Sequence, residues 1–142
     1  MILVDSGPLI PAAITRQPAN HACVETFTGL RLARRRLFVP ATVVAEVGFM
    51  LEKLGEPRAE TAFLRALGQR DFTAVDLTPT DYCRMAELVE QYDDLPLGTT
   101  DASVIALAER PGTTEIATLD RRHFTAVRPR HVEAFSLLPE RL

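Results

Sequence analysis

The chain has 142 residues, of which 46% are hydrophobic and 25% charged, a composition typical of one folded domain with a sizeable core. Its 16 basic and 19 acidic residues give a net charge of −3, and taken alone this sum argues against binding nucleic acid through overall charge. The chain contains no apolar run of the roughly 18–20 residues that a membrane span needs. It also begins without the basic and apolar segments of a signal peptide.

Its two cysteines, Cys23 and Cys83, form no metal-binding pair and fit a reducing compartment better than a disulfide framework. We therefore expect a cytoplasmic protein with no membrane partner. The glycines never approach the spacing of a dinucleotide fingerprint or a phosphate-binding loop, which excludes both of these sites.

Short apolar runs alternate with helical patterns along the chain. Strands are predicted over residues 1–4, 37–39, 72–77, 116–119 and 134–138. A short helix is predicted after Ser6-Gly7-Pro8, and longer helices over 20–35, 42–54, 58–67, 80–92 with Thr80 as the cap, and 100–109. Strands that alternate with helices predict an α/β fold of three layers, α/β/α, around a mostly parallel sheet of about five strands. We expect residues 1–142 to form a single domain.

Two acidic residues come directly after predicted strands. Asp5 follows Ile2-Leu3-Val4, and Asp120 follows Ile116-Ala117-Thr118-Leu119. Ligands of open α/β sheets bind beyond the carboxyl ends of the strands, so both positions lead to one edge of the sheet. When either residue is considered singly, a structural role as a helix cap or in a turn explains its position about as well as a role in ligand binding.

Two further acids lie on predicted helices, close to their apolar sides. Glu46 borders a stripe formed by Val43, Val47, Met50 and Leu54. Asp101 lies within the apolar stripe of its helix, between Ala108 and Ile105. A carboxylate within an apolar stripe is costly to bury without a partner. The helix dipole favours an acid in the first turn, but it does not explain why Asp101 lies on the apolar face of its helix.

If these four carboxylates converge, they need a counter-charge. Two carboxylates ~4 Å apart repel by ~4 kcal/mol at an effective dielectric constant near 20. Several hard oxygen ligands together favour Mg²⁺ or Mn²⁺ over Zn²⁺. Such ions activate water and stabilise the leaving oxygen in phosphoryl chemistry. The residues alone therefore predict metal-dependent hydrolysis of a phosphodiester.

Four segments together resemble one known family, in its order and with similar intervals. They are Met-Ile-Leu-Val-Asp-Ser-Gly at 1–7, Pro-Ala-Thr-Val-Val-Ala-Glu-Val at 40–47, Asp-Leu-Pro-Leu-Gly-Thr-Thr-Asp-Ala at 94–102 and Ala-Thr-Leu-Asp-Arg-Arg-His-Phe at 117–124. The chain resembles the PIN-domain ribonucleases, and among them the VapC-type toxins of type II toxin–antitoxin pairs.

The resemblance implies a PIN-like fold and a Mg²⁺- or Mn²⁺-dependent endoribonuclease toxin. Its catalytic and metal-binding acids would be Asp5, Glu46, Asp101 and Asp120. The resemblance assigns supporting roles to the hydroxyls of Ser6 and Thr118 and to the loop acid Asp94. It also implies an RNA substrate, a cognate VapB-type antitoxin with a basic arm that complements the acids, and a homodimer.

Arg121 and Arg122 directly follow Asp120 and are expected to contact RNA phosphates at the edge of the site, although an ordinary solvated surface would also explain them. The three histidines have no paired nucleophile, so the sequence gives no reason to assign one as a general base.

Three other functions fit the sequence less well. A PIN-like protein that binds RNA or a partner without cleaving stays open as the alternative, although the four acids are all present. A phosphoacceptor receiver needs paired acids near the first strand and a late lysine, whereas the only lysine is Lys53 in mid-chain. A haloacid-dehalogenase phosphatase needs an acid two residues after Asp5, where Gly7 stands.

Overall fold

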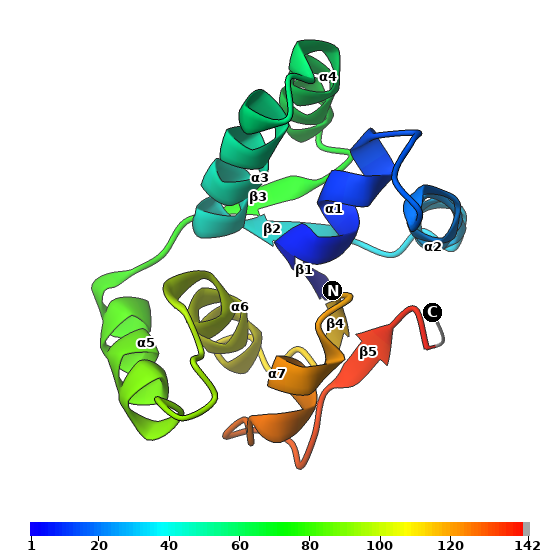
Figure 1. The fold of residues 1–142 in the computed structure, drawn as a ribbon. Helices are drawn as coiled ribbons and strands as arrows, with labels where there is room; N and C mark the ends of the chain where they lie inside the picture. Colours follow the sequence, from blue (N-terminus) through cyan, green and yellow to red (C-terminus); the bar gives the residue numbers. More distant parts are fainter. Residues whose placement is uncertain (141–142) are drawn as a thin grey trace.

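The computed structural model describes residues 1–140, and its centre is a parallel sheet of five strands in the order β3-β2-β1-β4-β5 (Figure 1). The strands are β1 (Ile2–Val4), β2 (Leu37–Pro40), β3 (Thr73–Val75), β4 (Glu115–Ala117) and β5 (Ser136–Leu138). The central strand β1 pairs with β2 on one side and with β4 on the other. All residues of β1 and β2 are buried, which explains their continuous apolar sequences.

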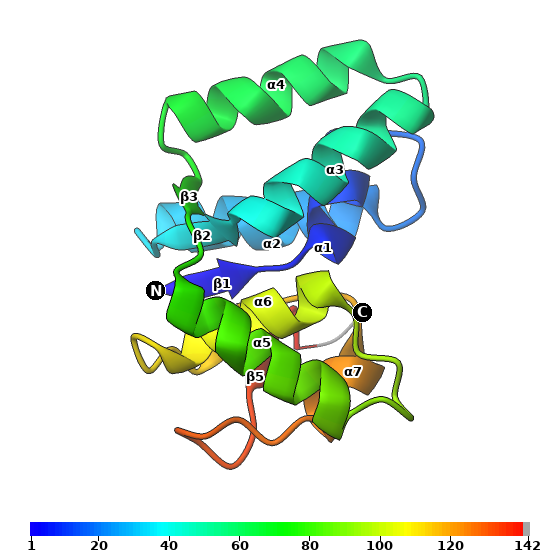
Figure 2. The same ribbon diagram turned by 90° about the vertical axis from the view of Figure 1, so that its left-hand side faces the viewer.

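Within residues 1–140, seven helices connect and cover the strands. They are α1 (Ser6–Ala13), α2 (Asn20–Leu32), α3 (Ala41–Lys53), α4 (Pro57–Gly68), α5 (Pro79–Gln91), α6 (Thr99–Glu109) and α7 (Arg121–Ala126). Helices α1–α4 lie together on one side of the molecule and α5–α7 on the other, in both views (Figures 1 and 2). Because parallel crossovers are right-handed, the two groups cover opposite faces of the sheet. The predicted three-layer α/β fold with five strands is therefore confirmed.

Helix α6 is more deeply buried than its sequence pattern indicates. Every residue from Ala102 to Ala108 is buried, because α6 packs between α5 and strands β1 and β2. The predicted apolar stripe on this helix is therefore too narrow. On α3, the buried positions are Val43, Val47 and Leu51, and Leu54 is exposed, which corrects the stripe predicted there.

Two helix boundaries differ from the prediction for local reasons. Helix α5 begins at Pro79 and is capped by Thr78 instead of Thr80. The Thr78 hydroxyl accepts the Asp81 N–H at 3.3 Å, and the Asp81 carboxylate accepts the Thr78 N–H at 2.8 Å. Helix α2 ends at Leu32 because Arg34 takes a φ of +57° and closes a Schellman turn.

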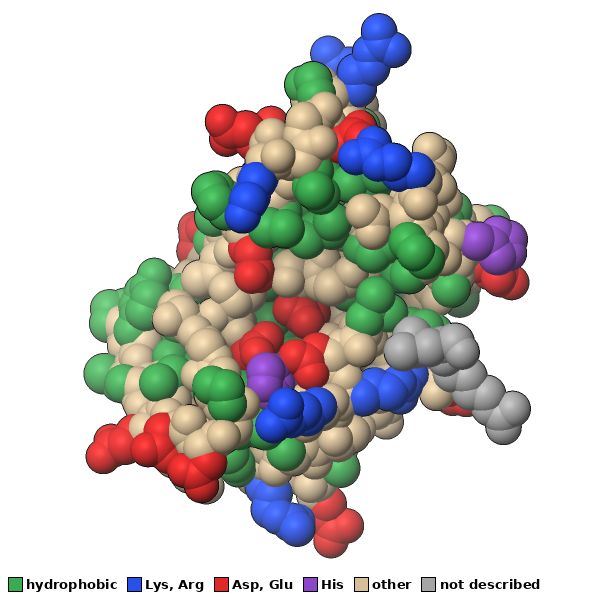
Figure 3. Space-filling view, in the orientation of Figure 1, with side chains coloured by type: hydrophobic (Ala, Val, Ile, Leu, Met, Phe, Trp, Pro, Cys, Tyr) green, Lys and Arg blue, Asp and Glu red, His purple; other side chains and the backbone are tan. Residues whose placement is uncertain are grey.

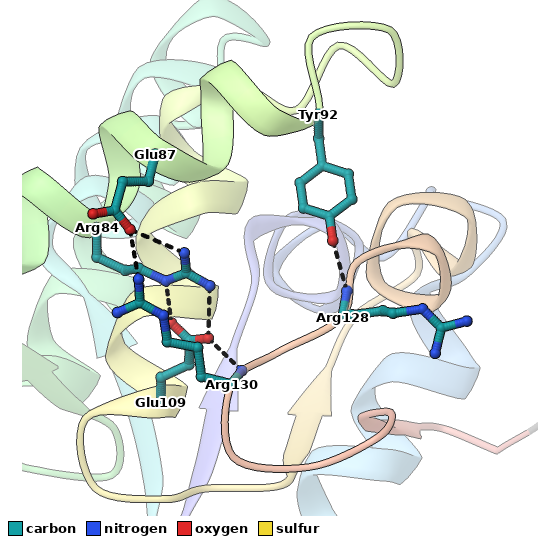
Figure 4. A network of polar contacts seen from close by, with 6 residues as sticks. All are labelled: Arg84, Glu87, Tyr92, Glu109, Arg128 and Arg130. Carbon is teal, nitrogen blue, oxygen red and sulfur yellow. Dashed lines mark hydrogen bonds and ion pairs between the residues drawn. The ribbon is translucent and has the colours of Figure 1, made fainter.

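A polar network joins the segment after α7 to helices α5 and α6 (Figure 4). The Arg84 guanidinium donates to both carboxylate oxygens of Glu109, at 2.7 and 3.0 Å, and the Arg130 N–H donates to the same carboxylate at 2.7 Å. Burial acts to raise the pKa of Glu109, but these donors outweigh it and hold that pKa below its usual value. Farther along, the Tyr92 hydroxyl accepts the Arg128 N–H at 3.0 Å.

Over residues 1–140, the protein has no helix with the length and apolar character needed to cross a bilayer.

Candidate active site

Asp5 lies where β1 ends, at the centre of the sheet. Its backbone N–H donates to the Ala117 carbonyl at 2.9 Å, and its side chain is 4% exposed. Oδ2 accepts a hydrogen bond from the Thr118 hydroxyl at 2.9 Å. Oδ1 is buried and has no hydrogen-bond partner among residues 1–140. Oδ1 of this buried carboxylate is therefore free to bind a ligand.

Asp120 lies at the same edge, after β4, and Thr118 joins it to Asp5. The Thr118 oxygen accepts the Asp120 N–H at 2.9 Å while its hydroxyl donates to Asp5. Asp120 also caps α7, because its Oδ1 accepts the His123 N–H at 3.0 Å. Asp120 is therefore both a helix cap and a member of the cluster, since its Oδ2 lies 2.7 Å from Nδ1 of His123 and groups with Asp101.

Glu46 and Asp101 come from α3 and α6, two helices that a pair of hydroxyls holds together. The Thr42 and Ser103 oxygens lie 2.6 Å apart, and the Ser103 hydroxyl donates to the Thr100 carbonyl at 2.6 Å. Thr42 precedes Glu46 by about one helical turn, and Ser103 lies two residues after Asp101. This contact therefore helps to align α3 with α6 and, with them, the two acids.

The Glu46 carboxylate reaches the cluster from a half-buried position. Its Oε2 is buried and has no hydrogen-bond partner in the described part of the chain. Both Asp5 and Asp101 are close enough for the Glu46 charge to raise their pKa values. Glu46 thus belongs to the same acidic group, although its side chain makes no bond to the other three acids in residues 1–140.

The structure adds His123, which the sequence interpretation missed. Its Nδ1 lies 2.9 Å from Asp101 Oδ2 and 2.7 Å from Asp120 Oδ2. Potential ligand atoms of these three residues lie within 4.8 Å of one another. The only sequence feature that could have indicated His123 is its position three residues after Asp120. That spacing brings two side chains together only on a helix, and the sequence pattern does not predict α7.

The gathered carboxylates change one another's pKa values. Burial and the nearby charges of Asp101 and Glu46 raise the pKa of Asp5 from 3.8 to about 6, against the opposing effects of Thr118 and the Ser6 N–H. Burial also raises the pKa of Asp101, with Asp120 and Glu46 acting in the same direction and His123 opposing them. Figure 3 shows the acidic side chains grouped around one histidine, in a hollow between the two helical groups.

The remaining residues expected at the site lie around this cluster. Ser6 begins α1 next to Asp5 and is half-buried. Asp94 is exposed in the loop between α5 and α6, and the structure gives it no contact with the four acids in residues 1–140. The Arg121 guanidinium donates to the Pro139 carbonyl, and Arg122 is exposed on α7, one residue before His123.

Comparison with known proteins matches this geometry to one family. The family model of the PIN domain matches residues 2–128. The chain belongs to the PIN-domain family. The resemblance inferred from the four sequence segments is thereby confirmed.

One relative extends over the whole PIN-domain chain. It is Ribonuclease VapC26 of Mycobacterium tuberculosis strain H37Rv, 30% identical over 138 residues, which cover 97% of this chain and 100% of the relative. The chain is similar to this ribonuclease along its full length, and not only around the acids.

Two solved structures share the fold. VapC20 of M. tuberculosis, a toxin that cleaves the sarcin–ricin loop, superimposes with a TM-score of 0.74 at 14% identity, over 84% of this chain and 90% of that one. FitAcB from Neisseria gonorrhoeae gives a TM-score of 0.65 at 21% identity, over 89% and 92% of the two chains. At these identities, the likeness shows the PIN fold.

The PIN nucleases are metal-dependent, and the side chains of this PIN domain fit a divalent cation. Two buried carboxylate oxygens, Asp5 Oδ1 and Glu46 Oε2, have no hydrogen-bond partner in residues 1–140. Leaving a buried polar atom without its hydrogen bond costs about 1–3 kcal/mol of folding free energy. Burying an unpaired charge on that atom costs more. A hard cation among these oxygens supplies the missing interaction and the counter-charge.

Proposed function

We propose that this PIN-domain protein is a metal-dependent endoribonuclease that serves as the toxin of a type II toxin–antitoxin pair. The observation that carries the proposal is the convergence of the acids on β1, α3, α6 and the start of α7, with two buried oxygens left unpaired. Similarity to a named ribonuclease along the whole chain supports RNA as the substrate class.

In this proposal, Asp5, Glu46, Asp101 and Asp120 are the catalytic acids, and they hold Mg²⁺ or Mn²⁺. Such an ion, when bound, supplies the Lewis acid for phosphodiester hydrolysis. Oxygen-only ligation by these acids suits either ion. The carboxylates would hold the ion in a hollow of the protein surface, a place that an RNA strand could reach.

The supporting residues orient the acids without touching the substrate. Thr118 is fully buried and bonds to both Asp5 and Asp120, so it acts as a positioning residue. The Ser6 hydroxyl, next to Asp5 at the start of α1, is proposed to support the same site, and the Ser6 backbone N–H lowers the pKa of the Asp5 carboxyl. Asp94 is proposed to support the site through its loop, in which the neighbouring Leu95 carbonyl contacts His123. The Asp94 side chain itself is exposed.

RNA binding is proposed to use Arg121 and Arg122, which follow Asp120 at the start of α7. Figure 3 shows basic side chains directly beside the acidic group. Guanidinium groups at that edge hold RNA phosphates and offset the repulsion between the acids and the nucleic acid. Arg122 is the stronger candidate, because the Arg121 guanidinium already donates to the Pro139 carbonyl.

The proposed assembly comprises a VapB-type antitoxin and a second copy of this chain. A basic arm of the antitoxin would complement the acidic site directly. Exposed apolar side chains on two helices support self-association, namely Phe49 on α3 and Tyr82 and Val89 on α5. We place this pair in the cytoplasm, consistent with the two free cysteines.

We further propose that residues 1–142 form one domain, of which 141–142 lie outside the described residues. The support is a single hydrophobic core that includes side chains from both helical groups.

Cleavage of RNA by the purified protein tests the proposal. With Mg²⁺ or Mn²⁺ we expect endonucleolytic products from structured and unstructured RNA, and no products in EDTA. Asp101→Asn keeps the side-chain shape and removes the charge, and should lower cleavage by at least about 100-fold. Cleavage that survives both EDTA and Asp101→Asn would overturn the metal–carboxylate mechanism. RNA binding by the wild type without any cleavage under these conditions would favour a non-cleaving PIN protein.

A further inference from the structure

We propose that His123 is itself a ligand of the bound ion, so that the site carries one imidazole nitrogen besides its carboxylates and prefers a transition-metal ion such as Mn²⁺ to Mg²⁺. This inference rests on the proposed metal site. It goes beyond a site made of acids alone.

The first argument is the tautomer of His123. Its Nε2 lies 2.9 Å from the Leu95 carbonyl oxygen, which can only accept a hydrogen bond. Nε2 must therefore carry a proton, and in the neutral ring Nδ1 then presents a lone pair. Metal-ligating histidines typically donate their other ring N–H to a backbone carbonyl in this way.

The second argument is what Nδ1 faces. It is buried and has no hydrogen-bond partner within residues 1–140, although oxygens of Asp101 and Asp120 lie 2.9 and 2.7 Å away. With the ring neutral, this lone pair and the two carboxylate oxygens repel one another, and an ion held by all three atoms would remove that repulsion.

The third argument is how firmly the ring is held. His123 is the third residue of α7, and its backbone N–H is fixed by the Asp120 cap. Leu95 lies in a turn before Pro96, and its own N–H donates to the Tyr92 carbonyl at 3.1 Å, which helps to hold this loop against the ring. The ring is thus anchored on both sides, by α7 and by the loop between α5 and α6.

The chemical consequence concerns metal selectivity. Mg²⁺ prefers oxygen ligands, whereas the affinity of sites that include nitrogen rises along the first transition row from Mn²⁺. A single imidazole among carboxylates therefore shifts the preference from Mg²⁺ toward Mn²⁺. The competing role for His123 is that of a cation that neutralises Asp101 and Asp120 and must be displaced when an ion binds.

Pulsed electron paramagnetic resonance of Mn²⁺ bound to the wild-type protein tests this directly and needs no variant. We expect the ¹⁴N modulation of a directly coordinated imidazole. His123→Gln keeps an amide N–H near the Nε2 position for Leu95 and removes the Nδ1 ligand. It should abolish the modulation and weaken Mn²⁺ binding by about 10-fold or more, with a smaller change for Mg²⁺.

The outcomes separate the two proposals. If Mn²⁺ binds and RNA is cleaved, but the wild type shows no nitrogen coupling, or His123→Gln binds Mn²⁺ as tightly or more tightly, His123 is not a ligand and the proposed function stands. If the wild type fails to bind Mn²⁺ in calorimetry, the metal site itself is wrong. Circular dichroism of His123→Gln establishes that the variant is folded.

Discussion

The Thr118 hydroxyl donates a 2.9 Å hydrogen bond to Oδ2 of Asp5, although the two residues lie on different strand ends. The same oxygen accepts the Asp120 N–H, so one buried side chain fixes two acids of the site. This arrangement places the proposed metal site at the edge of the sheet and links its geometry to the buried core.

Replacing Thr118 by valine tests this coupling. Thr118→Val keeps the shape but leaves the Asp5 oxygen and the Asp120 N–H without partners. We expect a loss of about 1–3 kcal/mol in the free energy of unfolding and roughly 10-fold weaker Mn²⁺ binding. Urea titration and calorimetry measure the two effects. Thr118→Ser, which retains the hydroxyl, should restore most of both, and a neutral Thr118→Val would show that Thr118 only fills space.

The contact between Thr42 and Ser103 predicts that a substitution outside the acidic cluster weakens metal binding. Thr42→Val removes one hydroxyl of the 2.6 Å pair that aligns α3 with α6. We expect about 1 kcal/mol lower stability and roughly 10-fold weaker metal binding, because Glu46 and Asp101 lose their shared register. Thr42→Ser is the matched control. Equal metal affinity in the valine and serine variants would contradict this positioning role.

The raised pKa of Asp5 predicts how the stability of the metal-free protein depends on pH. The folded protein holds this proton up to about pH 6, whereas the unfolded chain releases it near pH 3.8. Asp5 therefore contributes stability below pH 3.8 that is lost as the pH rises through about 6. The loss amounts to about 3 kcal/mol, from the difference between the two pKa values.

Asp5→Asn should remove this dependence. In EDTA, we expect the variant to gain stability relative to the wild type as the pH rises from about 4 to about 7, by about 1–3 kcal/mol. Urea unfolding across that range measures the difference between the two proteins. With saturating Mn²⁺ the order should reverse, since only the wild type gains from binding. A difference that is constant with pH in EDTA would show that Asp5 has an ordinary pKa.

The pair formed by Arg84 and Glu109 predicts a structural effect away from the active site. Both side chains are largely buried, so Glu109→Ala leaves the Arg84 guanidinium with only the half-exposed Glu87 carboxylate and should cost up to about 3 kcal/mol. Glu87→Ala, at a carboxylate that is 55% exposed, should change stability by less than about 1 kcal/mol. Thermal unfolding of both variants gives the comparison. Equal losses would mean that burial does not strengthen this network.

The two arginines after Asp120 should differ in their effect on RNA. Arg122→Ala should weaken RNA binding several-fold and reduce the slope of log affinity against log salt by about 1. Arg121→Ala should have less effect on binding, because its guanidinium donates to the Pro139 carbonyl. Arg58→Ala on α4 serves as a distant control. The opposite order, measured by fluorescence anisotropy across salt concentrations, would exclude Arg122 as the main phosphate contact.

The fold and most of the acidic cluster could be predicted because they follow from periodicity. The strand ends of a parallel sheet share one edge, so the positions of Asp5 and Asp120 directly after apolar runs indicate a common site. Helical spacing brings Glu46 and Asp101 to the buried sides of their helices, although α6 is buried more completely than its pattern indicates.

The features that the sequence did not predict depend on contacts that leave no periodic pattern in the sequence. The six-residue helix α7 is too short for a periodic signal, so nothing in the sequence pattern puts His123 beside the acids. The bond between Thr42 and Ser103 joins side chains 61 positions apart, and neither belongs to a recognisable motif. Thr80 is the predicted cap of α5, whereas a capping box forms at Thr78 because Asp81 reaches back to its N–H.

The rate of RNA cleavage as a function of added Mn²⁺, starting from chelator-treated protein, tests the central claim most directly. The four acids predict no cleavage without metal, a saturable rise on addition of Mn²⁺, and a curve for Asp120→Asn shifted to higher concentrations or abolished. A rate that is independent of Mn²⁺, or a curve that Asp120→Asn leaves unchanged, would contradict a metal-dependent ribonuclease built on these carboxylates.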